Sequence, residues 1–149
     1  MSARELAAQG EATIRTIDKG LRAAAAAQDK KGYNVSLLDL EGKCSYTDAL
    51  LIVSAHSERQ ATAIADGVIE SLRKDLGQKP LFREDGGGWS VIDYGDLIVH
   101  VFQEDTRVYY DLDQLWADAP RVPVPLPESQ LEAPSSPTRL AERRKRFSS

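Results

Sequence analysis

The sequence predicts an α/β domain in which helices cover one face of a mixed β-sheet. Two long stretches carry apolar residues every three or four positions, which is typical of amphipathic helices. Several short runs rich in branched apolar residues predict strands. The predicted order is helix, strand, strand, helix, three strands and a last helix, so one face of the sheet is expected to stay partly open. At 149 residues the chain fits one domain with tails, large enough to fold without disulfides.

The first predicted element is a helix. Residues 1–10 are expected to form a flexible leader before it. Residues 11–31 are rich in alanine and place Ile14 and Ile17 at helical spacing. Gly32 is a suitable residue to end the helix. The folded domain is therefore expected to begin with this helix.

Two strands and a second helix follow. Residues 34–40 and 49–54 are apolar runs of strand length. Ser57 is a good N-cap, and Gln60 three positions later completes a capping box. The helix that starts there carries apolar residues on one stripe and is expected to end at Gly77.

The segment from Trp89 predicts a tight hairpin. Gly95 supplies the positive φ that a two-residue loop needs, and the loop is expected at Tyr94-Gly95. In that register Asp93 faces Asp96, Val91 faces Ile98 and Trp89 faces His100.

The two faces of this hairpin differ, because side chains alternate along a strand. One face is apolar apart from a serine and carries Ser90, Ile92, Leu97, Val99 and Val101. The other mixes aromatics, acids and a histidine, and carries Trp89, Val91, Asp93, Asp96, Ile98, His100 and Phe102. We interpret the first face as core and the second as a surface for a partner. The predicted partner-binding residues are Trp89, Asp93, Tyr94, Asp96 and His100.

The remaining segments are predicted to be short or irregular. Residues 80–82 are expected to form a short edge strand, since proline is confined to edges, and residues 85–88 a flexible loop. Residues 109–116 have helical spacing. The folded domain is expected to span residues 11–119. Residues 120–149 are rich in proline and then basic, which predicts a disordered tail without regular elements.

Charge and composition exclude several classes of protein. Residues 1–116 hold 13 Lys and Arg against 19 Asp and Glu, a net charge of −6. Residues 117–149 hold 6 against 4, a net charge of +2. An acidic domain suits a basic protein surface better than a phosphate backbone. RNA contact by the basic run at 143–146 is therefore the less favoured reading, and a solvated tail is preferred.

Cysteine content and hydropathy limit the possibilities further. The single cysteine, Cys44, excludes an intrachain disulfide and a multi-cysteine zinc site, and we expect it to be a buried spectator thiol. The longest apolar run is strand-sized, so no membrane span is expected. The first residues lack the apolar core of a secretory signal. A cytoplasmic location is expected.

Several side chains allow both a chemical and a structural interpretation. Asp93 and Asp96 are a potential metal-binding or acid–base pair, but aspartate beside a turn commonly bonds the local backbone. We favour turn chemistry or partner recognition over catalysis. Trp89 is either a core residue or an interface anchor. His100 has no paired nucleophile, so a hydrogen-bonded structural role is preferred. Ser57 is expected to cap its helix instead of binding an anion.

Three segments of the chain resemble the ribosomal silencing factor S (Iojap-like) family. They are WSVIDYGDLIVHVF at residues 89–102, the strand and helix at residues 48–66, and the Arg…Tyr…Leu…Leu-Trp pattern at residues 107–116. The chain departs from the family at residues 54–56, where the family usually has Ser-Gly, and at Asp113, where it usually has glutamate.

This resemblance covers roughly residues 11–122 and implies a nucleotidyltransferase-like α/β domain. It implies a translational repressor, without catalysis, cofactor or metal, that acts when nutrients are short. The implied partner is the large ribosomal subunit, bound through ribosomal protein L-fourteen so that the small subunit is blocked from joining. A homodimer through the open sheet face is compatible with the pattern. A nucleotidyltransferase-like enzyme and a large-subunit assembly factor remain the alternatives.

Overall fold

The computed structural model describes residues 3–127, with side chains from residue 16 onward. A six-stranded sheet lies at its centre, in the order β3-β4-β5-β2-β1-β6. The strands are β1 (Tyr33–Asp39), β2 (Ala49–Ala55), β3 (Phe82–Gly86), β4 (Trp89–Asp93), β5 (Leu97–Gln103) and β6 (Arg121–Val122). The helices are α1 (Ala3–Asp29), α2 (Glu58–Leu76), α3 (Glu104–Tyr110) and α4 (Leu112–Leu115). The predicted mixed sheet is confirmed. The predicted order of the first eight helices and strands along the chain is confirmed as well.

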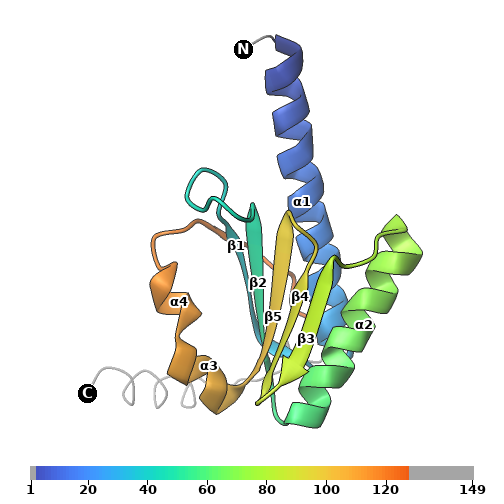
Figure 1. The fold of residues 1–149 in the computed structure, drawn as a ribbon, viewed down its shortest axis with the longest axis vertical. Coiled ribbons are helices and arrows are strands. Elements are labelled where there is room, and N and C mark those ends of the chain that lie inside the picture. Colours follow the sequence, from blue (N-terminus) through green and yellow to red (C-terminus); the bar gives the residue numbers. More distant parts are fainter. Residues whose placement is uncertain (1–2, 128–149) are drawn as a thin grey trace.

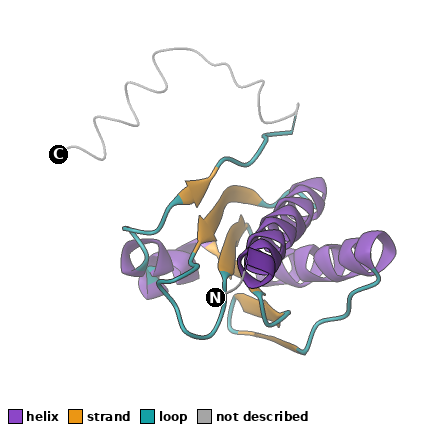
Figure 2. Ribbon diagram, turned by 90° about the horizontal axis from the view of Figure 1, so that it is seen from above, coloured by secondary structure: helices purple, strands orange, loops and turns teal. Residues whose placement is uncertain are grey.

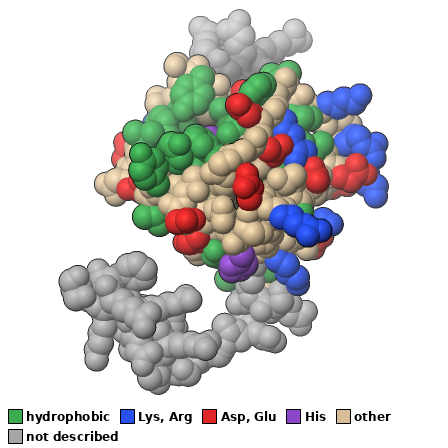
Figure 3. Space-filling model, turned by 60° about the horizontal axis from the view of Figure 1, so that its bottom comes forward, with side chains coloured by type: hydrophobic (Ala, Val, Ile, Leu, Met, Phe, Trp, Pro, Cys, Tyr) green, Lys and Arg blue, Asp and Glu red, His purple; other side chains and the backbone are tan. Residues whose placement is uncertain are grey.

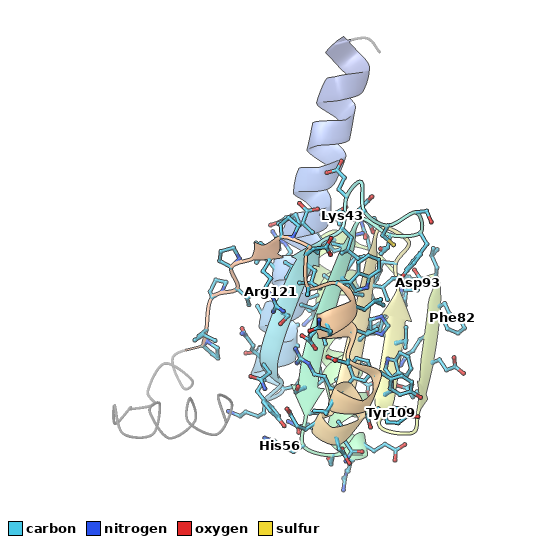
Figure 4. All side chains as sticks on the ribbon, turned by 90° about the vertical axis from the view of Figure 1, so that its left-hand side faces the viewer. Lys43, His56, Phe82, Asp93, Tyr109 and Arg121 are labelled. Carbon is cyan, nitrogen blue, oxygen red and sulfur yellow. The ribbon has the colours of Figure 1, made fainter. Side chains whose placement is uncertain are left out.

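The helices divide between the two faces of the sheet (Figure 1). The two long helices, α1 and α2, lie together on one face, as predicted. The last predicted helix was expected on the same face, and this is wrong: α3 and α4 lie across the opposite face. Seen from that side, they stand in front of the middle of the sheet and leave the β4 and β3 side uncovered (Figure 4). The open face is therefore only part of the sheet's second surface.

The strand β2 is the centre of the core. All seven of its residues are buried, and it pairs antiparallel with β1 and parallel with β5. Continuous burial explains why its sequence is apolar without alternation. Its side chains enter two clusters, one under α1 and α2 and the other under α4. Seen from above, the sheet lies between the helices (Figure 2).

The predicted helix ends are partly confirmed. The hydroxyl of Ser57 accepts a hydrogen bond from the backbone of Gln60 at 3.0 Å, and the side chain of Gln60 accepts one from His56 at 2.6 Å. Gly77 closes α2 with φ 65°. The start of the first helix was placed too late: α1 begins at Ala3, so most of the expected flexible leader at residues 1–10 is helical.

The sequence pattern misplaced one strand and missed another. The edge strand predicted at residues 80–82 is β3 at Phe82–Gly86, so Asp85 and Gly86 belong to a strand and not to the expected loop. The glycines Gly87 and Gly88, expected in a loop, form a two-residue turn with φ 62° and 77°, joining β3 to β4. Positive φ at both positions is what the favoured hairpin turn requires. The strand β6 lies within the segment from residue 120 that was predicted to hold no regular element. It forms because Leu37 and Leu38 of β1 offer a free edge.

The closing segment is also different from the prediction. Residues 109–116 do not form one helix, because Asp111 adopts φ 47° and separates α3 from α4. The predicted basic run at 143–146 lies outside the described residues. Within the described part, no helix is long and apolar enough to cross a membrane. Cys44 is half-buried beside the cluster under α4.

Candidate protein-binding face

The hairpin predicted from Trp89 onward is present, but the predicted register differs from the observed one by two residues. Trp89 pairs with Phe102, Val91 with His100 and Asp93 with Ile98. The backbone N–H of Tyr94 donates to the carbonyl of Leu97 at 2.8 Å, so the loop is Gly95-Asp96 and not Tyr94-Gly95. A shift of two keeps every side chain on its predicted face, because the period of a strand is two.

The predicted division into two faces is confirmed for the strands. The apolar face is buried under α1 and α2, with Ser90, Ile92, Leu97, Val99 and Val101 all at 2% exposure or less. On the other face β3 contributes further side chains, since Phe82 pairs with Asp93 and Glu84 with Val91. We call this surface the open face and define it as Phe82, Glu84, Trp89, Val91, Asp93, Ile98 and His100. Figure 4 shows it from the front, with Phe82 on the edge strand β3 and Asp93 on the neighbouring strand β4.

Trp89 is the centre of an aromatic cluster at one border of the open face. Its ring lies 4.9 Å from that of Phe102 and 4.6 Å from that of Tyr110 on α3. The ring of His100 lies 5.6 Å away on the other side. Trp89 is half-buried by these contacts. It is thus both a packing residue and part of the surface, so the two readings of the sequence are not exclusive.

His100 is held as a neutral ring. Its Nδ1 accepts a hydrogen bond from Nε1 of Trp89 at 2.9 Å. Burial lowers the pKa of His100 from 6.5 to about 4, because the charged form loses its hydration. A proton on Nδ1 would also break the bond to Trp89. The geometry is that of a structural histidine, as preferred from the sequence.

Asp93 lies on the open face and shapes the turn beside it. Its Oδ1 accepts a hydrogen bond from the backbone N–H of Gly95 at 2.7 Å. This is the local turn chemistry that aspartate favours. Its other carboxylate oxygen has no role in that turn.

Asp96 does not face Asp93, so the predicted facing pair of carboxylates is wrong. The Asp96 carboxylate accepts a hydrogen bond from the ammonium group of Lys19 on α1 at 2.6 Å. It accepts a second one from the hydroxyl of Thr16 at 2.8 Å. The Lys19 side chain is only 6% exposed. Asp96 therefore ties the hairpin turn to α1 on the opposite side of the sheet, a contact between residues 77 positions apart that local pattern cannot reveal.

Tyr94 is also misplaced in the predicted site. It is 8% exposed and belongs to the core under α1 and α2, with the ammonium of Lys19 5.6 Å from its ring centre. Burial raises its pKa to about 12. A side chain in that position is not available to a partner on the open face.

The sequence pattern missed the surface that α3 adds to this region. Tyr109 is 82% exposed, Val108 70% and Tyr110 49%. The signal was present as three adjacent large side chains that fit no single apolar stripe. Viewed from the bottom of the molecule, hydrophobic side chains gather on the side of α3 and α4, while lysine and arginine lie mostly on the opposite side (Figure 3).

Hollows with acidic residues flank the aromatic cluster. One is lined by Glu84, Asp85 and Trp89 among others. The other includes Asp105 and Tyr109. Among the described residues, no group of three or more His, Cys, Asp or Glu side chains is placed to hold a metal ion. The arrangement offers aromatic area with nearby negative charge, which favours basic and apolar groups on a partner.

The fold and this surface define a small mixed-sheet α/β protein whose exposed sheet face is aromatic and acidic. Comparison with known proteins makes the class specific. A family model described as "Ribosomal silencing factor during starvation" matches residues 13–148. The chain belongs to this family of ribosomal silencing factors.

Individual relatives agree with that assignment. Ribosomal silencing factor RsfS of Bacillus subtilis is 38% identical over 99 residues, which cover 66% of this chain and 84% of the relative. The chloroplastic protein Iojap of Zea mays is 28% identical over 109 residues, covering 70% of this chain and 45% of that protein. A crystal structure of a Chromobacterium violaceum protein matches with a TM-score of 0.63 at 31% identity, covering 67% of this chain and 84% of that one. The family resemblance stated from the sequence is confirmed.

Proposed function

We propose that this chain binds the large ribosomal subunit through its open face and α3, and that the bound chain blocks the small subunit sterically. The proposed contact is ribosomal protein L-fourteen, and the proposed place of action is the cytoplasm. The action requires occupancy alone, without a reaction, a cofactor or a metal. Membership of the ribosomal silencing factors supports a ribosomal partner.

The observation that carries this proposal is the aromatic surface at the border of the open face. Tyr109 and Tyr110 are exposed, while Trp89 packs against Tyr110 and is held by stacking on Phe102 and by its bond to His100. Rigid, amphipathic aromatics of this kind dominate the energetics of protein interfaces. The surface is therefore preorganised for contact before any partner arrives.

Charge supports a protein partner with a basic surface. The net charge of −6 on residues 1–116 would slow association with RNA and speed association with a basic protein. On the open face this charge comes from Glu84 and Asp93, with Asp105 beside Tyr109. Asp96 is removed from this set because Lys19 neutralises it.

The central experiment measures co-sedimentation of the full chain with purified large subunits. Tyr109→Ser should weaken binding by about thirtyfold, the usual effect of removing an interface hot spot. Its fold should not change, because the side chain is 82% exposed. Tyr46→Ser is the matched control, since Tyr46 is 63% exposed in the loop between β1 and β2. Lys43 of that loop lies at the opposite end of the sheet from Tyr109 (Figure 4).

A second experiment tests the consequence of binding. Large subunits preincubated with the chain should form fewer joined ribosomes when small subunits are added, and Tyr109→Ser should restore joining. If Tyr109→Ser and the wild type bind equally well, the interface does not include Tyr109 and lies elsewhere. Normal subunit joining with the chain bound would favour the assembly-factor alternative. Metal-dependent nucleotidyl transfer that disappears in Asp93→Asn would favour the enzyme.

The open face together with α3 is also the surface we propose for pairing of two copies. Such a homodimer would hide Tyr109 and compete with the ribosome. Sedimentation equilibrium of the wild type and Tyr109→Ser measures this directly. A dimer that Tyr109→Ser leaves intact would contradict pairing through this face.

A further inference from the structure

Helix α3 is packed in the reverse of the usual way. An ordinary surface helix buries its apolar side chains and exposes its charged ones. In α3 the only buried residue is Arg107, at 9% exposure, while Val108 and Tyr109 are 70% and 82% exposed. The helix is thus attached to the sheet through a guanidinium group, and its apolar side faces outward.

The Arg107 guanidinium joins α3 to three other elements. Its Nε and Nη2 donate to the two carboxylate oxygens of Asp113 on α4, at 3.0 and 2.9 Å. Its Nη1 donates to the hydroxyl of Ser54 on β2 at 2.8 Å and to the backbone carbonyl of Asn34 on β1. The fork shape of arginine allows this set of simultaneous bonds, which a lysine ammonium does not reproduce.

The backbone around this group adopts rare conformations. Asn34 has φ 48° at an irregularity in β1, where the pairing with β2 shifts between Tyr33 and Ser36. Asp111 has φ 47° and ends α3. Left-handed conformations of residues other than glycine are uncommon and carry a cost. The residue that supplies the carbonyl to Arg107 and the residue that breaks the helix before Asp113 both adopt one.

We propose that Arg107 is the positioning residue of the binding surface: it fixes α3 on the sheet with its apolar side outward. In that position the Tyr110 ring packs against the Trp89 ring at a centroid distance of 4.6 Å, and Tyr109 is presented to the partner. This inference rests on the proposed function, because it assigns Arg107 a role in the same surface. The strong bond to Arg107 also keeps the pKa of the Asp113 carboxyl below its usual range.

The test replaces Arg107 with lysine in the full chain, which keeps the charge and removes the fork. Hydrogen exchange of the α3 amides should speed up by about tenfold or more, and the near-ultraviolet circular dichroism of the Trp89–Tyr110 pair should decrease. Large-subunit binding should weaken by about tenfold or more. The strands should keep their protection, because β2 and β5 remain paired.

Arg121→Lys is the matched control. Its guanidinium donates to the hydroxyl of Ser36 at 3.1 Å, a group that Arg107 also approaches at 3.4 Å, but it lies on the exposed edge strand β6. In Arg121→Lys the hydrogen-exchange rates of the α3 amides and the affinity for large subunits should stay within about twofold of the wild type, because an exposed contact contributes little.

Two changes at Asp113 keep the test valid if Arg107→Lys does not fold. Asp113→Asn should release α3 and weaken binding in the same direction, while Asp113→Glu, which keeps the carboxylate, should restore both. Protected α3 amides in both Arg107→Lys and Asp113→Asn would overturn the inference, as would a released α3 with unchanged binding. A wild type that does not bind large subunits would overturn the proposed function instead. Faster α3 exchange in Arg107→Lys would still support the role of Arg107 in placing the helix.

Discussion

Acid should destabilise this domain through His100. The ring is buried and neutral in the folded state, with a pKa lowered from 6.5 to about 4. Between these two values the unfolded chain binds a proton that the folded chain does not. Stability therefore falls as the pH falls through that window, and the full penalty is reached below about pH 4.

The size of this effect follows from the shift. A pKa that falls from 6.5 to about 4 changes the free energy of unfolding by at most about 3 kcal/mol between high and low pH. Between about pH 7 and about pH 4.5, His100 should account for a loss of about 2 kcal/mol in the free energy of unfolding. Protonation also removes the acceptor of the Trp89 bond, which acts in the same direction.

The assay is urea unfolding followed by far-ultraviolet circular dichroism at both pH values. His100→Gln keeps a neutral acceptor for Trp89 and removes the titrating group. The wild type should lose about 2 kcal/mol more than His100→Gln on acidification, since carboxylates such as Asp113 and Asp85 contribute equally to both proteins. Equal losses in the two proteins would refute the burial of a neutral His100.

Three further predictions concern the stability of the fold. Asp96→Asn should lower the free energy of unfolding by about 2 kcal/mol, because Lys19 keeps a buried charge without its partner; denaturant unfolding measures this, and an unchanged midpoint would contradict it. Gly95→Ala should cost about 1 kcal/mol in the same assay, since its φ is 89°; a neutral result would show that the turn relaxes. Removal of residues 128–149 should leave the thermal midpoint unchanged. Removal of 120–149 should lower it, because β6 and its apolar contacts are lost. Equal melting of the two truncated chains would show that β6 contributes nothing.

The elements that were predicted correctly depend on local signals. The cap at Ser57 and the stop at Gly77 are formed by residues within one turn of the helix ends. The two faces of the hairpin were correct despite the wrong register, because alternation is a property of each strand alone. Register depends on which residue enters the loop, and Gly95 is compatible with either of two loops.

The candidate site shows the same division. Trp89, Asp93 and His100 share one face, as alternation predicted. Tyr94 continues the alternation of Ser90 and Ile92 and therefore lies on the core face. Asp96 leaves the open face because it lies in the turn, where α1 offers Lys19 and Thr16. The contribution of Tyr109 was missed, since its exposure depends on how α3 is attached to the sheet.

The sequence by itself determined the fold class, the order of the main elements, the two faces of the hairpin and the family, since each is encoded in contiguous residues. Only the tertiary structure decided the partners of Asp96, the outward orientation of α3 and the pairing of β6. These depend on contacts between residues far apart in the chain, such as Arg107 with Asn34 and Ser54. A buried guanidinium forms such bonds wherever the fold brings acceptors together, and no periodicity of the sequence records where that is.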